Sequence, residues 1–147
     1  MAICLATVAA AGCVAVWAVS LEPNQLVVHQ VSVVLPRLPV VDDGMRVAVI
    51  TDLHAGAPFI DVPKIRTVVD RTNAANPDLT VILGDLVLGH MVGGHFVPPE
   101  RIARELGRLR APLGNHDGWV DAPRIAAALR TSGITVLRDR AVERAAS

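Results

Sequence analysis

The chain has 147 residues with 14 basic and 14 acidic side chains, so its formal net charge is zero. A zero balance excludes a general nucleic-acid-binding protein, which needs surplus cations to displace phosphate counterions. Hydrophobic residues make up 52% of the chain and charged residues 19%, which excludes a disordered protein. The length allows one compact domain, at roughly 150 residues per domain.

The first 20 residues form an apolar leader with no charged side chain, and 17 of them are hydrophobic. As a helix they would span roughly 30 Å, the thickness of a bilayer core. A signal anchor fits better than a cleaved signal, because no basic residue precedes the segment and the apolar run is long. We therefore predict a single-pass N-terminal membrane anchor. Its orientation stays open, since the first basic residue is Arg37.

Residues 21–45 are predicted to be a connector, with a β-branched strand at 26–34 followed by a Pro-rich segment. Residues 46–147 then alternate short apolar runs with amphipathic segments. The apolar runs predict strands at 46–50, 79–83 and 134–137, the first of them buried on both faces. The amphipathic segments predict helices from Asp61 to a stop at 76–78, over 98–110 and over 121–133. This alternation is typical of an α/β fold with one mainly parallel sheet and flanking helices.

Three short polar motifs lie where such a fold binds ligands. They are Asp52-Leu-His54, Gly84-Asp85 and the Gly-Asn-His-Asp sequence at 114–117. The first two directly follow predicted strands, and open parallel sheets bind ligands outside the carboxyl ends of their strands. Each motif alone is commonly a turn or a helix cap. The evidence for a shared site is the spacing, because Asp52 to Asp85 and Asp85 to Asn115 are each separated by one βα unit. Carboxylate, imidazole and amide donors without thiolate suit Mn, Fe, Zn or Mg.

These donors predict a pair of divalent metal ions, which can grip a phosphate and lower the pKa of a bound water. Asp85 is expected to bridge the two ions. The remaining ligands are expected to be Asp52 and His54 on one ion and Asn115 on the other. His116 is expected to hydrogen-bond the phosphoryl or leaving-group oxygen, with Asp117 orienting its ring. We interpret His90 and His95 as part of a flexible Gly-rich loop; the alternative is that they are further ligands.

The same motifs resemble a known family. The segments ITDLHAG, VILGDLV and GNHD, at 50–56, 81–87 and 114–117, are similar to the first three motifs of calcineurin-like metallophosphoesterases. The similarity is nearest to a membrane-associated bacterial subgroup, related to phosphodiesterases and UDP-diacylglucosamine pyrophosphohydrolases. It implies an αββα sandwich, a dinuclear centre and hydrolysis of a phosphodiester or pyrophosphate by a metal-bound hydroxide. A lipid-linked or nucleotide-linked substrate at a membrane is expected, whereas the substrate's identity and the oligomeric state stay open.

The sequence departs from the family pattern after the third motif and just before it. Relatives have two further His-containing motifs, including Gly-His-x-His, and the chain has neither before Ser147. Relatives also have an apolar strand ahead of the third motif, where this chain has only Ala-Pro-Leu-Gly at 111–114. Four residues reach at most ~14 Å, against the roughly 17–20 Å of an ordinary strand. The strand can still form if the preceding helix stops at Gly107 and residues 108–113 become extended.

These departures lead to two further expectations. The first is a partial sandwich without its second sheet, which leaves an apolar sheet face exposed. The second concerns function: the alternative to an active hydrolase is a truncated, catalytically inactive, membrane-tethered remnant with at most a weak metal site.

Overall fold

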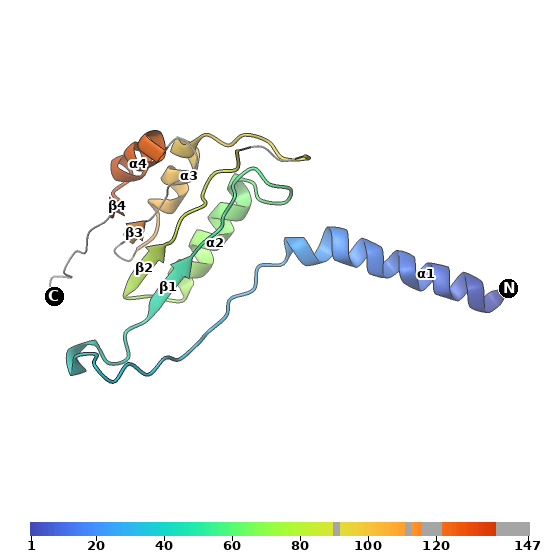
Figure 1. The fold of residues 1–147 in the computed structure, drawn as a ribbon, viewed down its shortest axis with the longest axis horizontal. Helices are drawn as coiled ribbons and strands as arrows, with labels where there is room; N and C mark the ends of the chain where they lie inside the picture. The colour runs from blue at the N-terminus through green and yellow to red at the C-terminus, as the bar shows by residue number, and fades with distance from the viewer. Residues whose placement is uncertain (90–91, 111–112, 116–121, 138–147) are drawn as a thin grey trace. The chain divides into compact units, whose positions relative to one another are not determined.

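The computed structural model describes residues 1–89, 92–110 and 122–137, and the backbone of 113–115 (Figure 1). The chain divides into two compact units, Met1–Leu35 and Pro36–Ser147. The domain boundaries predicted after residues 20 and 45 stay predictions.

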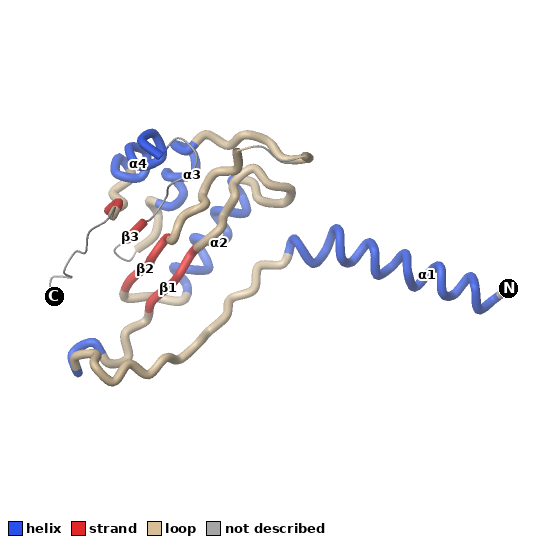
Figure 2. The backbone as a smooth tube through the Cα atoms, in the orientation of Figure 1, coloured by secondary structure: helices blue, strands red, loops and turns tan. Residues whose placement is uncertain are grey.

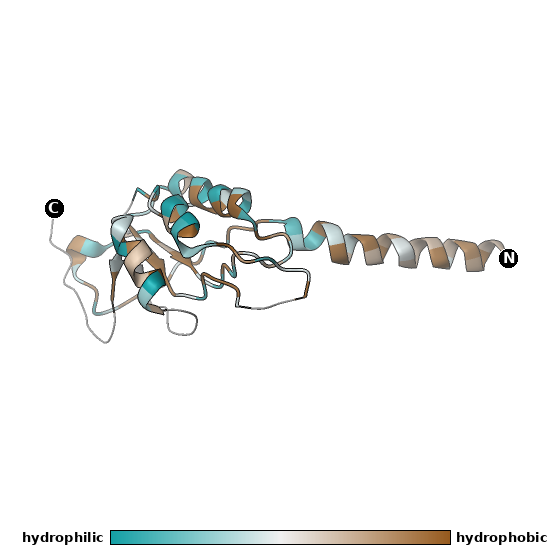
Figure 3. Ribbon diagram, turned by 90° about the horizontal axis from the view of Figure 1, so that it is seen from above, coloured by the Kyte–Doolittle hydropathy of each residue, from teal (hydrophilic) through white to brown (hydrophobic). Residues whose placement is uncertain are grey.

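The first unit is dominated by one apolar helix. Helix α1 covers Ala2–Val16 and continues through a π-helical turn at Trp17–Leu21 and a 3-10 turn at Glu22–Asn24. None of the residues of α1 is buried, and Figure 3 shows apolar residues along its whole length. Within the described residues, Ala2–Asn24 is the one helix long and apolar enough to cross a membrane. A secretory signal near the N-terminus also meets these criteria of length and composition.

The strand predicted at 26–34 is not found in the structure, where residues 25–35 form neither helix nor strand. β-branched residues favour a strand only where they pack beside a second one, and two strands alone are marginally stable in water. The composition of this segment was therefore a misleading guide. A short 3-10 turn at Val40–Asp42 follows before the sheet begins.

A four-stranded parallel sheet forms the centre of the second unit, in the order β1-β2-β3-β4 (Figure 2). The strands are β1 at Val47–Ile50, β2 at Leu79–Ile82, β3 at Leu113–Asn115 and β4 at Thr135–Val136. β1 and β2 run in register from Val47 with Leu79 to Ile50 with Ile82. The strands predicted within 46–50, 79–83 and 134–137 are confirmed, because short apolar runs rich in Val and Ile suit a parallel sheet.

Two of the three crossover helices have clear start or stop signals. The helices are α2 at Val62–Ala74, α3 at Pro99–Leu106 and α4 at Ala122–Thr131. Asp61 caps α2, where its carboxylate accepts the Lys64 N–H at 2.8 Å. Helix α4 ends before Gly133 at φ +82°, and the Ile134 N–H donates to the Leu129 carbonyl at 3.0 Å, as in a Schellman motif.

Helix α3 is shorter than its predicted range of 98–110. It ends at Leu106 and is followed by Gly107, so the expected extension to residue 110 was wrong. Glycine weakens a helix, and here it is also needed for space. A Cβ at position 107 would come within 2.8 Å of the Ser132 carbonyl oxygen. The helix thus stops at Gly107, as the alternative with a strand at 108–113 requires. However, β3 begins at Leu113, and residues 108–110 are not a strand.

The hydrophobic core lies on one face of the sheet. Sequential strand order with right-handed crossovers places the three crossover helices, α2, α3 and α4, on the same side of the sheet. Helix α3 packs between α2 and α4. The core combines Ile50, Ile82 and Val136 of the strands with Ile65, Val69, Ile102, Leu106, Ile125 and Leu129 of the helices.

The other face of the sheet carries exposed apolar side chains. Val49 is 58% exposed, whereas Ile50 beside it is 6% exposed. Val47 and Leu83 are about half exposed. The prediction that β1 is buried on both faces was therefore wrong, while the expectation of an exposed apolar sheet face is confirmed.

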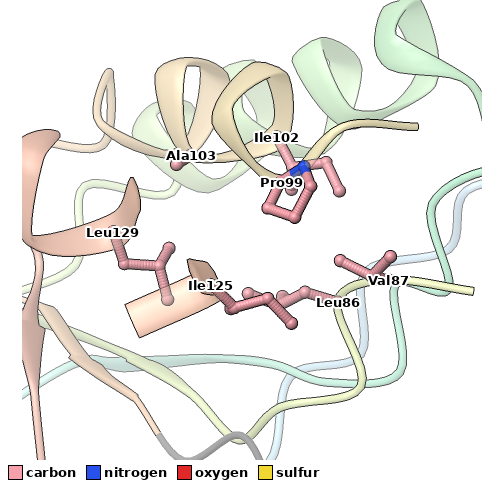
Figure 4. A pocket seen from close by; sticks show the side chains of 7 residues that line it. All are labelled: Leu86, Val87, Pro99, Ile102, Ala103, Ile125 and Leu129. Atoms are coloured by element: carbon pink, nitrogen blue, oxygen red, sulfur yellow. The ribbon is translucent and has the colours of Figure 1, made fainter. Parts of the chain in front are cut away.

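The helices close tightly over the chain that follows β2. Figure 4 shows this seam, where Leu86 and Val87 face Pro99, Ile102 and Ala103 of α3 and two residues of α4. The space between these side chains is too small for a water molecule. This seam is therefore part of the core and not a ligand site.

Candidate metal centre

The candidate metal centre is built where β1 and β2 end. Their parallel register brings Ile50 and Ile82 level with each other, and backbone hydrogen bonds continue the pairing beyond both strands. The Asp52 N–H donates to the Gly84 carbonyl at 3.2 Å. The His54 N–H donates to the Asp85 carbonyl at 2.8 Å. Two segments more than 30 residues apart in the sequence are thereby held side by side.

The backbone at these positions has an unusual conformation. Asp52, His54 and Asp85 have φ angles of +53°, +41° and +53°, in the left-handed region. Asp and His enter this region more readily than most residues, but each such residue costs of order 1–3 kcal/mol and persists only where its surroundings impose it. Three of them within one hydrogen-bonded pair of segments point to a functional constraint on side-chain direction.

The three side chains converge. One ligand atom from each of Asp52, His54 and Asp85 lies within 4.8 Å of the other two. His54 Nε2 is 3.7 Å from Asp52 Oδ1, and the Thr51 hydroxyl donates to Asp52 Oδ2 at 2.6 Å. Thr51 thus fixes one carboxylate oxygen and leaves the other facing the histidine. This contact was missed from the sequence, where its only signal was a hydroxyl residue immediately before Asp52.

The donor set fits a divalent cation. Two carboxylates this close repel each other, and a cation between them removes that cost. Oxygen and imidazole donors suit Mn, Fe, Zn or Mg better than soft ions. The side chains of Asp52 and His54 are about half exposed, so an ion can reach them from solvent. The predicted grouping of Asp52, His54 and Asp85 is thus present in the structure as three neighbouring ligand candidates.

The third predicted motif is placed only in part. Asn115 is the last residue of β3, and its backbone is in register with Ile82, three residues before Asp85. His116 and Asp117 lie outside the described residues, as does His90. The assignment of Asn115 as a metal ligand, and of His116 and Asp117 to the reaction, stays a prediction.

His95 is not among the converging ligands of the described residues. Its backbone N–H donates to the carbonyl of Gly56 at 2.8 Å, two residues beyond His54. Its loop is thus tied to the segment that leaves the candidate centre.

A parallel sheet with an oxygen and imidazole cluster at the carboxyl ends of its strands is an α/β arrangement that could hold a metal ion. The model of a protein family described as calcineurin-like phosphoesterase matches residues 45–141. The chain therefore belongs to the calcineurin-like phosphoesterase family, as the three motifs predicted, and its fold is consistent with part of the family's fold.

Two curated relatives extend this finding. The chain is 35% identical over 108 residues to UDP-2,3-diacylglucosamine pyrophosphatase LpxG of Chlamydia trachomatis, a match that covers 69% of the chain and 31% of that protein. It is 31% identical over 113 residues to the transmembrane protein with metallophosphoesterase domain of Danio rerio, over 68% of the chain and 24% of that protein. The chain thus spans about a quarter to a third of the length of these relatives.

Proposed function

We propose that the chain is a metal-dependent phosphoester hydrolase whose Asp52, His54 and Asp85 hold divalent metal. The observation that carries this proposal is the convergence of their three ligand atoms within 4.8 Å, in a chain of the calcineurin-like phosphoesterase family. Divalent metal bound there supplies positive charge for the phosphate and lowers the pKa of coordinated water. The metal's identity is proposed only as far as the donors allow: Mn, Fe, Zn or Mg.

The chain's own residues are proposed to divide the work. Asp85 would help to hold both of two metal ions and Asn115 the second of them, so that the centre would be dinuclear. Thr51, by its hydrogen bond to Asp52, orients the carboxylate that faces His54. His116 hydrogen-bonds the phosphoryl or leaving-group oxygen, and Asp117 orients its ring.

The proposed substrate is a lipid-linked or nucleotide-linked phosphodiester or pyrophosphate at a membrane. This is supported by the similarity to two relatives, one a UDP-2,3-diacylglucosamine pyrophosphatase and the other a transmembrane protein with a metallophosphoesterase domain. The apolar helix Ala2–Asn24 supports a membrane anchor at the N-terminus. We propose no role in nucleic-acid binding, because the net charge is zero.

One observation favours a second candidate, a membrane-tethered protein that binds metal without hydrolysing phosphoesters. Asn115 is level with Ile82, and Asp85 lies three residues farther along the neighbouring chain. Three residues correspond to about 10 Å when fully extended, and the positive φ angles of Gly84 and Asp85 bend this stretch to a shorter span. A metal shell that depends on both residues requires their side chains to cover the distance that is left.

Asp85→Asn is the decisive variant, and Asp43→Asn, an exposed Asp in the connector, is its matched control. Both remove one negative charge. We expect Mn²⁺ binding by calorimetry, and metal-dependent turnover of a phosphodiester, to be lost in the first variant and retained in the second. Equal turnover by the original chain and Asp85→Asn refutes the hydrolase. Metal binding that depends on Asp85 without any turnover supports the second candidate.

A further inference from the structure

Two loops without charged side chains leave the candidate metal centre. Residues 53–60 contain no Asp, Glu, Lys or Arg, and neither do residues 86–99. The chain has two Phe residues in all, and both lie in these stretches, as Phe59 and Phe96. The two stretches beside the centre therefore lack charged residues and contain both phenylalanines of the chain.

The tips of these stretches, residues 55–60 and 92–97, are joined by a backbone hydrogen bond and together form the loop pair. The His95 N–H donates to the Gly56 carbonyl at 2.8 Å, and the Gly56 N–H donates to the Ile60 carbonyl at 2.8 Å. A Cβ at Gly93 would be 3.7 Å from Pro58 Cγ, which is ordinary contact distance. The loop pair therefore presents one surface, and Gly56 connects it to His54 across a single residue.

The surface of the loop pair is apolar and exposed. Phe59 is 41% exposed, Phe96 is 58% exposed and Val92 is 99% exposed. Phe59 also has a φ of +70°, which for a bulky residue is a true outlier that its surroundings must impose. A partly exposed aromatic side chain on a strained backbone favours a binding surface at this position.

We infer that the loop pair inserts Phe59, Val92 and Phe96 into the acyl region of a lipid bilayer. Such insertion leaves no charged side chain to be stripped of water, and aromatic rings are favoured at the membrane interface. The same chain carries a helix of sufficient length and hydropathy to span a bilayer. A protein partner fits less well, because protein interfaces carry polar rims with about one hydrogen bond per 100–200 Å². The loop pair offers His95 as its one polar side chain.

The consequence for the site rests on the proposed function. Inserted loops would hold Asp52, His54 and Asp85 at the level of the lipid headgroups. The substrate class is then a phosphoester carried on a lipid within the same membrane, rather than a phosphoester free in water.

The insertion is tested by fluorescence on the full chain, reconstituted in phosphatidylcholine and phosphatidylglycerol vesicles with brominated acyl chains. The reporter is Phe96→Trp in a background where Trp17 and Trp119 are replaced by Phe. The matched control is Arg104→Trp, an exposed position on α3, in the same background. We expect quenching about three times stronger at position 96, because inserted side chains lie roughly 5–10 Å within the headgroup boundary. Equal quenching at the two positions overturns the inference.

A second measurement separates the inference from the proposed function. Phe59→Ser with Phe96→Ser is expected to lower turnover of a vesicle-borne phosphodiester about tenfold and to leave turnover of bis(p-nitrophenyl) phosphate in solution unchanged. Equal losses on both substrates overturn the role in substrate class. If the original chain shows no turnover at all, the proposed function fails, while the quenching result still decides whether the loops insert.

Discussion

Replacing Glu105 by Gln tests whether a charge cluster around one buried carboxylate joins α2 to α3. The Glu105 carboxylate is 9% exposed and accepts two hydrogen bonds from Arg66, at 2.8 Å and 3.1 Å. Arg108 donates a third at 2.9 Å and also contacts Asp70 on α2 at 3.1 Å. The carboxylate is therefore well paired, and its removal leaves two cations without their common partner.

The size of the effect follows from the pKa of Glu105. Hydrogen bonding from Arg66 is the main cause that lowers this pKa from 4.5 to about 2; burial opposes it and Arg108 adds to it. A shift of this size corresponds to about 3 kcal/mol, at 1.36 kcal/mol per unit. Because both arginines are about half exposed, solvent screening reduces the expected contribution to about 1–2 kcal/mol.

The assay is urea unfolding of the chain in detergent micelles, followed by circular dichroism across pH. The folded pKa lies below the unfolded one, so the stabilisation is complete above about pH 4.5 and is lost as the pH falls toward about 2. The difference between the original chain and Glu105→Gln should therefore be about 1–2 kcal/mol near neutral pH and shrink through this window.

Two outcomes refute the reasoning. One is a difference in unfolding free energy that stays constant down to about pH 2, which means that the loss is one of packing and not of charge. The other is an equal loss in Glu100→Gln, the control, whose carboxylate pairs with Arg124 of α4 on the surface. An exposed pair is screened by solvent and should contribute less.

Two further predictions concern the backbone and the sheet. Gly56→Ala should lower the free energy of unfolding by more than about 1 kcal/mol and weaken Mn²⁺ binding, because the residue has a φ of +101° and a Cβ would overlap the His95 carbonyl oxygen. Thermal unfolding and calorimetry measure the two effects. Retained Mn²⁺ binding would show that the loop pair does not support the centre. Val49→Thr should change stability by less than roughly 0.5 kcal/mol, whereas Ile50→Thr should cost on the order of 1–3 kcal/mol; equal losses would mean that the face bearing Val49 is covered.

The sequence predicted those elements whose signals are local. Asp61 is followed three residues later by the N–H that it caps, and the runs at 46–50 and 79–83 contain strands of the expected type. It failed at 26–34, where the β-branched composition says nothing about the partner that a strand requires. It also extended α3 too far, because a glycine inside an amphipathic pattern is tolerated unless a neighbour such as Ser132 approaches it.

The candidate site was predicted for a similar reason. Asp52, His54 and Asp85 follow strands that are neighbours in both sequence and space, so a rule about strand ends was enough to bring them together. Their left-handed backbone was not predictable, because it comes from the hydrogen bonds between the two segments and not from the residue types. The strained and exposed Phe59 was missed for the same reason.

The strand order has a consequence for how the protein is made. Val47 pairs with Leu79, Thr80 with Leu113 and Gly114 with Thr135, so each strand joins the strand synthesised just before it. Domains generally begin to fold from the N-terminal side while the ribosome is still adding residues, and short sequence separations speed folding. Each of β2, β3 and β4 therefore finds its partner strand already made when it emerges, and none of these described strands has to wait for a distant segment.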